Sequence, residues 1–282
     1  MEIKTIGVVG AGLMGSGIAQ VCAAAGFNVV LCDVSPVAIE RAVSGIEGAL
    51  SKLVVKEKLS AESAADIVSR IRGTTNVEAL AESEFLIEAA TENVETKQKI
   101  LKQLDRIAMD GCVIATNTSS VSITKLAASL AMPERLVGMH FFNPVPVMAL
   151  VEVIRGIQTS DATLAATLAL AARIGKTTVS AKNAPGFVVN RVLVPMINEA
   201  IFVLQEGLTS ADEIDAAMKL GANHPIGPLA LADLIGLDTL LAVMEVFHRD
   251  FADSKYRPAP LLREMVDAGY LGRKSGRGFY VY

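Results

Sequence analysis

Short apolar runs alternate with longer helical patterns over the first two thirds of the chain. Residues 5–9 form a β-branched run that ends in glycines, and residues 13–25 carry small and apolar side chains suited to a closely packed helix. Gly26 is a natural end for that helix, and residues 28–32 are a second apolar run. This order predicts a strand, a glycine-rich turn, a helix and a second strand.

Further elements follow in the same alternating order up to about residue 180. Ser35 and Pro36 predict the start of a long helix, because serine caps helices and proline suits their first turn. Helices are expected at about 36–56, 60–70, 94–108 and 162–174, and strands at about 71–74, 85–89, 112–116, 136–139 and 177–179. Such alternation is typical of a mainly parallel sheet covered by helices.

The connection after residue 139 breaks this alternation. Residues 142–148 contain Pro144 and Pro146 and cannot form a helix, whereas parallel neighbours need a crossover of about a dozen residues or more. The apolar run at 149–154 is therefore expected to pair antiparallel with the strand before it. The sequence predicts an α/β Rossmann-like, mostly parallel sheet with an antiparallel edge.

The pattern changes again at Pro185 and Gly186, beyond which only the last few residues could form a strand. Helices are expected at 187–206 (interrupted by Pro195), 211–220, 229–247 and 261–268. We therefore expect two domains, residues 1–184 and an all-helical C-terminal domain at 185–282.

Composition and charge narrow the class of protein. Hydrophobic residues make up 51% of the 282, as in a globular protein, and 26 basic against 30 acidic residues give no reason to expect binding to nucleic acid or to an anionic membrane. No apolar run is long enough for a membrane span, and the N-terminus lacks a targeting pattern. Three cysteines without CxxC spacing argue against disulfides and a zinc site. We expect a cytoplasmic protein with no metal.

The turn after the first strand points to a dinucleotide cofactor. It reads Gly10-Ala11-Gly12-Leu13-Met14-Gly15, in which the glycines allow a tight turn, close approach of a pyrophosphate and close packing of helix and strand. Asp33 ends the second strand, where a carboxylate can bond ribose hydroxyls and would repel a 2′-phosphate. NAD is therefore favoured over NADP, although FAD-binding proteins share the glycine pattern.

His140 and Glu152 are the candidate catalytic pair. Glu152 lies between apolar residues, and a buried charge is costly unless it is paired. A carboxylate that holds a histidine builds a general base that works near neutral pH. His140 is expected just after a strand, where ligands bind in such domains, although a lone histidine can also be a core residue.

Two further polar residues are candidates for the same site. Ser119 follows the strand expected at 112–116, where it could bind substrate or cap a helix. Asn190 lies in the first turns of the helix after Pro185, where it could reach a cleft or make a bond between helices.

At these residues the chain resembles the L-3-hydroxyacyl-CoA dehydrogenases, most closely the bacterial 3-hydroxybutyryl-CoA dehydrogenases. The resemblance spans essentially the whole chain and is carried by GAGLMGSGIA at 10–19, NTSS at 117–120, GMHFFNPVPVM at 138–148, LVEVI at 150–154, APGFVVNR at 184–191, GANHPIGPL at 221–229 and LGRKSGRGFY at 271–280.

The resemblance implies a role for each candidate. His140 would take the 3-hydroxyl proton, Glu152 would orient it, and Ser119 and Asn190 would hold the substrate oxygens. Asp33 would bind the adenosine ribose. Further contacts to NAD are implied for Glu92, Lys97, Asn143 and Lys274, and contacts to the CoA phosphates for Lys52 and Lys56, which are otherwise residues of a solvated helix face.

The implied activity is the NAD-dependent interconversion of (S)-3-hydroxyacyl-CoA and 3-oxoacyl-CoA, with 3-hydroxybutyryl-CoA the expected substrate. The resemblance also implies a homodimer formed through the C-terminal helices, and a place in fatty-acid or butyrate metabolism. Chain-length preference and direction stay open. Two alternatives remain: a related dehydrogenase of a non-CoA hydroxy acid such as a sugar acid, and a dinucleotide-binding protein without activity.

Overall fold

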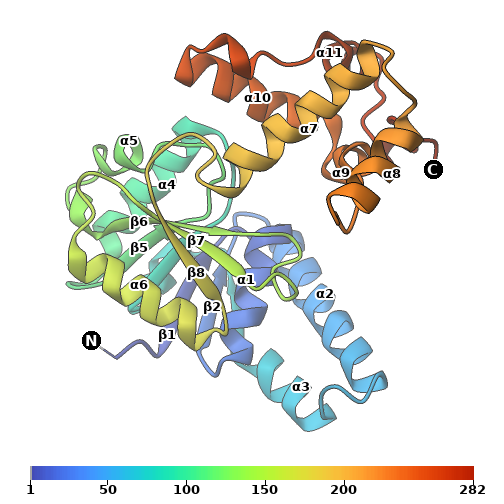
Figure 1. Ribbon diagram of the computed structural model, residues 1–282. Coiled ribbons are helices and arrows are strands. Elements are labelled where there is room, and N and C mark those ends of the chain that lie inside the picture. Colours follow the sequence, from blue (N-terminus) through green and yellow to red (C-terminus); the bar gives the residue numbers. More distant parts are fainter. Residues whose placement is uncertain (1) are drawn as a thin grey trace. The chain divides into compact units, whose positions relative to one another are not determined.

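The computed structural model describes residues 2–282 and divides into two compact units, the first ending at Ala184 and the second running from Pro185 to Tyr282 (Figure 1). No helix within residues 2–282 combines the length and the apolarity that crossing a bilayer requires. Each unit has its own hydrophobic core.

Among the described residues, the first unit holds one eight-stranded sheet in the order β3-β2-β1-β4-β5-β6-β7-β8. The strands are β1 Thr5–Val9, β2 Asn28–Cys32, β3 Ile71–Thr74, β4 Phe85–Glu88, β5 Val113–Thr116, β6 Leu136–Phe141, β7 Leu150–Arg155 and β8 Thr177–Lys182. Strands β1 to β6 are parallel, whereas β7 pairs antiparallel with β6 and parallel with β8. The predicted mostly parallel sheet with an antiparallel edge is confirmed.

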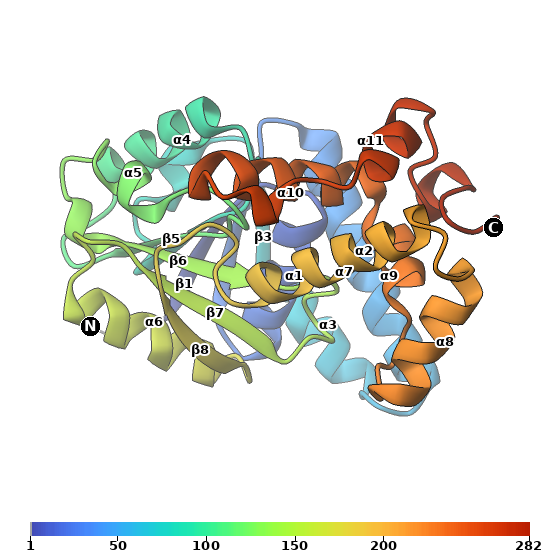
Figure 2. The ribbon, with the colours of Figure 1, turned by 45° about the horizontal axis from the view of Figure 1, so that its top comes forward.

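Helices cover both faces of this sheet. They are α1 Leu13–Ala24, α2 Pro36–Val55, α3 Ala61–Ser69, α4 Val94–Ile107, α5 Ile123–Ala127 and α6 Asp161–Arg173, with 3-10 turns at Val77–Leu80 and Pro133–Arg135. Ile18 of α1, Leu50 of α2 and Leu170 of α6 belong to one core with the strands, while α4 and α5 lie on the other face (Figures 1 and 2).

Local sequence signals account for most of these boundaries. Ser35 accepts a bond from the amide of Ala38 at 3.2 Å and is followed by Pro36, so this expected cap is confirmed, and Ser60 caps α3 by accepting a bond from the amide of Ser63 at 3.0 Å. Helix α5 was not predicted. Five residues are too few for a periodic pattern, although Ser122 caps this helix at the amide of Lys125.

The second unit is helical, as expected. Its helices are α7 Val189–Gln205, α8 Ala211–Gly221, α9 Pro228–Ile235, α10 Leu237–Phe251 and α11 Pro260–Asp267, with 3-10 turns at Ser254–Tyr256 and Arg273–Ser275. Pro195 lies inside α7 without ending it. The last residues form isolated bridges at Arg277 rather than a strand.

The single helix expected over residues 229–247 is wrong, because the chain breaks there into α9 and α10. Gly236 separates the two helices with φ +101°, a conformation that side chains rarely adopt. The amide of Leu237 then bonds the carbonyl of Leu271 at 3.3 Å instead of continuing the helix. The contact with Leu271 is made in the tertiary structure, so the apolar period alone could not reveal the break.

Candidate active site

His140 and Glu152 face each other across the antiparallel pair of β6 and β7. They are direct partners in the register, and the imidazole Nδ1 lies 2.8 Å from the carboxylate Oε2. The His140 residue is 6% exposed and Glu152 is completely buried. Because a carboxylate can only accept, Nδ1 carries the hydrogen of this bond and Nε2 is the basic nitrogen of the neutral ring. This is the geometry of an oriented general base.

His140 lies inside β6 rather than after it, since the strand runs two residues further than expected and ends at Phe141. The ladder to β7 extends it, because His140 and Phe141 both pair with residues of that strand. Asn117, directly after β5, accepts a bond from the amide of Phe141 at 2.9 Å. Sequence reasoning missed this contact, although the position of Asn117 at a strand end was a signal. It ties the loop after β5 to the strand of the base.

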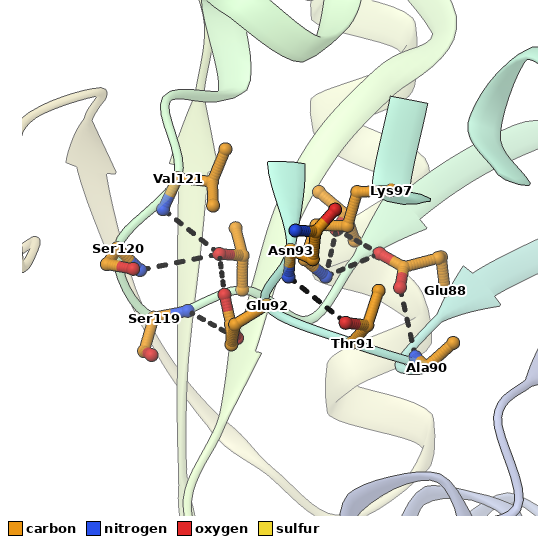
Figure 3. A network of polar contacts seen from close by, with 11 residues as sticks. Glu88, Ala90, Thr91, Glu92, Asn93, Lys97, Ser119, Ser120 and Val121 are labelled. Carbon is orange, nitrogen blue, oxygen red and sulfur yellow. Dashed lines mark hydrogen bonds and ion pairs between the residues drawn. The ribbon is translucent and has the colours of Figure 1, made fainter. Parts of the chain in front are cut away.

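Ser119 lies in that same loop and is half-buried (Figure 3). Glu92, from the connection between β4 and α4, accepts a bond from the Thr118 hydroxyl at 2.7 Å and one from the Ser119 amide at 3.3 Å. The Ser119 hydroxyl points away from Glu92 in Figure 3. Ser122, not Ser119, caps the following helix. Glu92 thus holds the backbone that presents Ser119.

A lysine that contacts a cofactor is expected to be exposed, but Lys97 is not. Its side chain is completely buried, and its ammonium group lies 2.7 Å from the equally buried Glu88 carboxylate. Thr116 donates to the same carboxylate at 2.6 Å. This cluster joins the carboxyl ends of β4 and β5. The predicted contact of Lys97 with NAD stays a prediction.

The glycine-rich turn has the shape that a pyrophosphate needs. Gly10 has φ +104°, and a Cβ atom there would lie 2.6 Å from the backbone of Ala90. A Cβ atom on Gly15 would lie 1.8 Å from the carbonyl oxygen of Gly10. In contrast, nothing lies within 4 Å of a Cβ on Gly12, and no side chain caps the start of α1. The open side of the turn and the uncapped helix amides therefore fit an anionic cofactor.

Asp33 is half-buried beside this turn. One carboxylate oxygen accepts a bond from the amide of Ala11 at 2.7 Å, and the other accepts one from the amide of Ser35 at 2.9 Å. Each carboxylate oxygen has a second lone pair, so both bonds are compatible with a further bond to a ribose hydroxyl. Asp33 also fixes the turn, which the sequence did not indicate.

A cleft of about 560 Å³ extends from the glycine turn between α1 and α2. Residues 143–146 of the connection between β6 and β7 form one wall, so Asn143 lines the cleft together with Gly12. Helix α2 continues beyond it to Lys52 in its last turn and to Lys56 at its C-cap, and both are exposed.

Asn190 and Lys274 belong to the second unit. Asn190 is the second residue of α7 and is half-buried. The guanidinium group of Arg191 lies 3.7 Å from the centre of the Phe251 ring and fixes the start of the helix. Lys274 forms an ion pair with Asp238 of α10. Their part in a site with His140 stays a prediction.

Comparison with known families identifies relatives of both units. The model for the NAD binding domain of 3-hydroxyacyl-CoA dehydrogenase matches residues 5–184, and the model for the C-terminal domain of the same family matches residues 186–282. The chain belongs to the 3-hydroxyacyl-CoA dehydrogenase family. Its first unit is accordingly an NAD-binding domain, which confirms the expected cofactor.

Members of the 3-hydroxyacyl-CoA dehydrogenase family resemble the chain over its full length. A probable 3-hydroxybutyryl-CoA dehydrogenase of Bacillus subtilis is 52% identical over 100% of this chain and 98% of its own. The 3-hydroxybutyryl-CoA dehydrogenase of Bradyrhizobium diazoefficiens is 51% identical over 99% and 96%. The crystal structure of (S)-3-hydroxybutyryl-CoA dehydrogenase from Ralstonia eutropha has 60% identity and a TM-score of 0.98, covering 100% of this chain and 99% of that one.

Proposed function

We propose that the protein interconverts (S)-3-hydroxyacyl-CoA and 3-oxoacyl-CoA with NAD, and that 3-hydroxybutyryl-CoA and acetoacetyl-CoA are its substrate pair. The observation that carries the proposal is the buried pair of His140 and Glu152 in a chain of this family. Strands β1 and β6 are parallel members of one sheet, so His140, near the end of β6, and the glycine turn after β1 lie at the same edge. A proton acceptor and a dinucleotide site at one sheet edge suit oxidation of an alcohol.

His140 is the acid and base of this reaction. NAD, when bound, supplies the hydride acceptor or donor. Nε2 of His140 takes the proton of the 3-hydroxyl group during oxidation, and the positive charge that appears on the ring is stabilised by Glu152 at 2.8 Å. In reduction the imidazolium returns the proton to the carbonyl oxygen. Such acid–base assistance is worth about 10²–10⁴-fold in rate.

Ser119 and Asn190 hold the oxygen atoms of the substrate by hydrogen bonds. The Ser119 backbone is fixed by Glu92, and the loop that carries Ser119 is tied to β6 by Asn117. These bonds position the Ser119 hydroxyl at the same sheet edge as His140, which supports its role. Asn190, the second residue of α7, is the other donor to the substrate in this proposal.

The glycine turn binds the pyrophosphate of NAD through its backbone. The open side at Gly12 and the amides that follow it, at Leu13 and Met14, support this assignment. Asp33 accepts a bond from the adenosine ribose. Glu92, Lys97, Asn143 and Lys274 complete the proposed cofactor contacts, with Lys97 acting from its buried position against Glu88.

The cleft between α1 and α2 holds the CoA arm of the substrate. It begins at Asn143, three residues after His140, and α2 leads from it to the exposed cations of Lys52 and Lys56. Two exposed lysines, one and two turns beyond the last α2 residue that lines the cleft, suit the phosphates of CoA.

Competition by free CoA separates this proposal from a dehydrogenase of a non-CoA hydroxy acid. We expect CoA alone to compete with acetoacetyl-CoA, and Lys56→Glu to raise the KM of the thioester without changing the NADH Kd. Lys99→Glu, which reverses an exposed cation on α4, is the matched control. A hydroxy-acid dehydrogenase would show neither effect, and a cofactor-binding protein without activity would bind NADH but never consume it.

Values of kcat/KM for C4, C8 and 3-oxoadipyl thioesters then identify the acyl group, and we expect the C4 thioester to be preferred. We further propose a cytoplasmic homodimer formed through the C-terminal helices, acting in fatty-acid or butyrate metabolism. Light scattering at micromolar concentration tests the dimer, since a monomeric mass would contradict it.

A further inference from the structure

We infer that Lys176 is a positioning residue that holds the connection between the two catalytic strands against the cofactor helix. This inference rests on the proposed function, because the strands it refers to carry His140 and Glu152. Lys176 stands directly before β8 and is 9% exposed. Its ammonium group donates to the carbonyl of Val145 at 2.6 Å and to the carbonyl of Met148 at 2.8 Å.

The charge of Lys176 is satisfied by peptide carbonyls. Within residues 2–282 no carboxylate forms an ion pair with it, and burial lowers the pKa of its ammonium group although the nearby Cys22 thiol acts in the opposite direction. An unpaired buried cation is costly, and so is a buried carbonyl without a donor. The two bonds offset both costs, but only while the connection keeps its present shape.

The connection that Lys176 holds has few other restraints of its own. The amides of Val147 and Met148 bond the carbonyl of Pro144 at 2.9 and 3.0 Å, forming one turn. The amide of Thr177, the residue after Lys176, bonds the carbonyl of Ala149 at 2.8 Å. Lys176 and the first residue of β8 therefore fix residues 145–149 from one side.

The other side of the connection forms one wall of the cleft that extends from the glycine turn. Val145 is 2% exposed and packs so closely on α1 that a Cβ atom on Gly17 would lie 2.8 Å from the Val145 Cβ. Residues 143–146 line the cleft together with Gly12 of the glycine turn. The same connection joins the end of β6 to the start of β7, whose register places His140 opposite Glu152. Lys176 thus fixes this wall, which lies beside the glycine turn that binds NAD in the proposed function, relative to the acid–base pair.

The test compares Lys176→Met, which keeps an unbranched side chain only one atom shorter but removes the donors, with Lys176→Arg, which keeps a cationic donor. Lys102→Met is the matched control, because it makes the same change at an exposed lysine on α4. For Lys176→Met we expect faster hydrogen exchange at the amides of Val147 and Met148. We also expect the NADH Kd to rise and kcat to fall, each by about ten-fold, and each ten-fold change equals about 1.4 kcal/mol. We expect Lys176→Arg to recover part of the NADH affinity and the control to match wild type.

A Lys176→Met variant with unchanged exchange at residues 147–148 and an NADH Kd within two-fold of wild type would overturn the inference. The inference would also be overturned if the variant unfolds at a lower temperature but has an unchanged NADH Kd and an unchanged kcat when both are measured well below that temperature. Lys176 would then stabilise the fold without positioning the site. If Lys176→Met does not fold, Lys176→Gln replaces it with the same expected direction, because the polar end of glutamine lies one bond nearer the backbone than the lysine ammonium group. Hydrogen exchange and NADH binding are measured without a thioester, so both tests remain possible if wild type fails to reduce acetoacetyl-CoA. That failure would contradict only the proposed function.

Discussion

Replacing Glu152 by glutamine removes the charge beside the catalytic imidazole and keeps the shape of the side chain. The carboxylate lies 2.8 Å from Nδ1 and is completely buried. Two unit charges about 4 Å apart interact by about 4 kcal/mol at an effective dielectric constant of about 20. If half to all of the imidazolium charge has developed in the transition state, the variant loses about 2–4 kcal/mol of its stabilisation. Each 1.36 kcal/mol is ten-fold, so kcat should fall by about 30- to 1,000-fold.

The assay is NADH consumption with saturating acetoacetyl-CoA, with the NADH Kd measured separately. We expect the NADH Kd to stay within about two-fold, because Glu152 acts through His140 and not on the cofactor. Glu84→Gln is the control, since Glu84 bonds the amides of Lys4 and Thr5 at the opposite end of the sheet. A Glu152→Gln variant with a kcat near that of wild type, or a loss found equally in Glu84→Gln, would refute the electrostatic argument.

Two further predictions concern the cofactor site and the core. Asp33→Arg should weaken NADH binding by about 10- to 100-fold, which is the worth of one or two hydrogen bonds to a charged group, and should improve NADPH binding. If titrations of both cofactors show an unchanged preference for NADH over NADPH, Asp33 is not the ribose ligand. Glu40→Arg, on the exposed face of α2, is the control. Burial raises the pKa of the Cys22 and Cys112 thiols to about 12, so both stay protonated at about pH 8. We therefore expect both to react with a thiol reagent only after the protein unfolds. Rapid labelling of either cysteine in the native protein would contradict their burial.

The sequence predicted those parts of the molecule that depend on local pattern. The boundaries of β1 and β2 coincide with the apolar runs, and the antiparallel return of β7 follows from the two prolines of a connection too short for a helix. The pairing of His140 with Glu152 was predictable for the same reason, because a buried carboxylate requires a partner. These features depend on neighbours in the chain or on the cost of burying a single charge.

The features that sequence reasoning missed depend on contacts between distant residues. Gly236 breaks an apolar period that reads as one helix, because the chain bonds Leu271 there. Lys97 reads as a cation of an amphipathic helix, yet Glu88 from β4 holds it in the core. Lys176 has no motif at all, since its role follows from two carbonyls some thirty positions earlier in the chain. Such roles become visible only when the packing is known.

Turnover by His140→Gln tests the central claim most directly. Wild type should oxidise NADH in the presence of acetoacetyl-CoA and form the (S)-alcohol, while His140→Gln should lose turnover by about 10²–10⁴-fold, the usual worth of a general acid–base group, with unchanged NADH binding. A His140→Gln variant that binds NADH and reduces acetoacetyl-CoA at a rate near that of wild type would contradict the account.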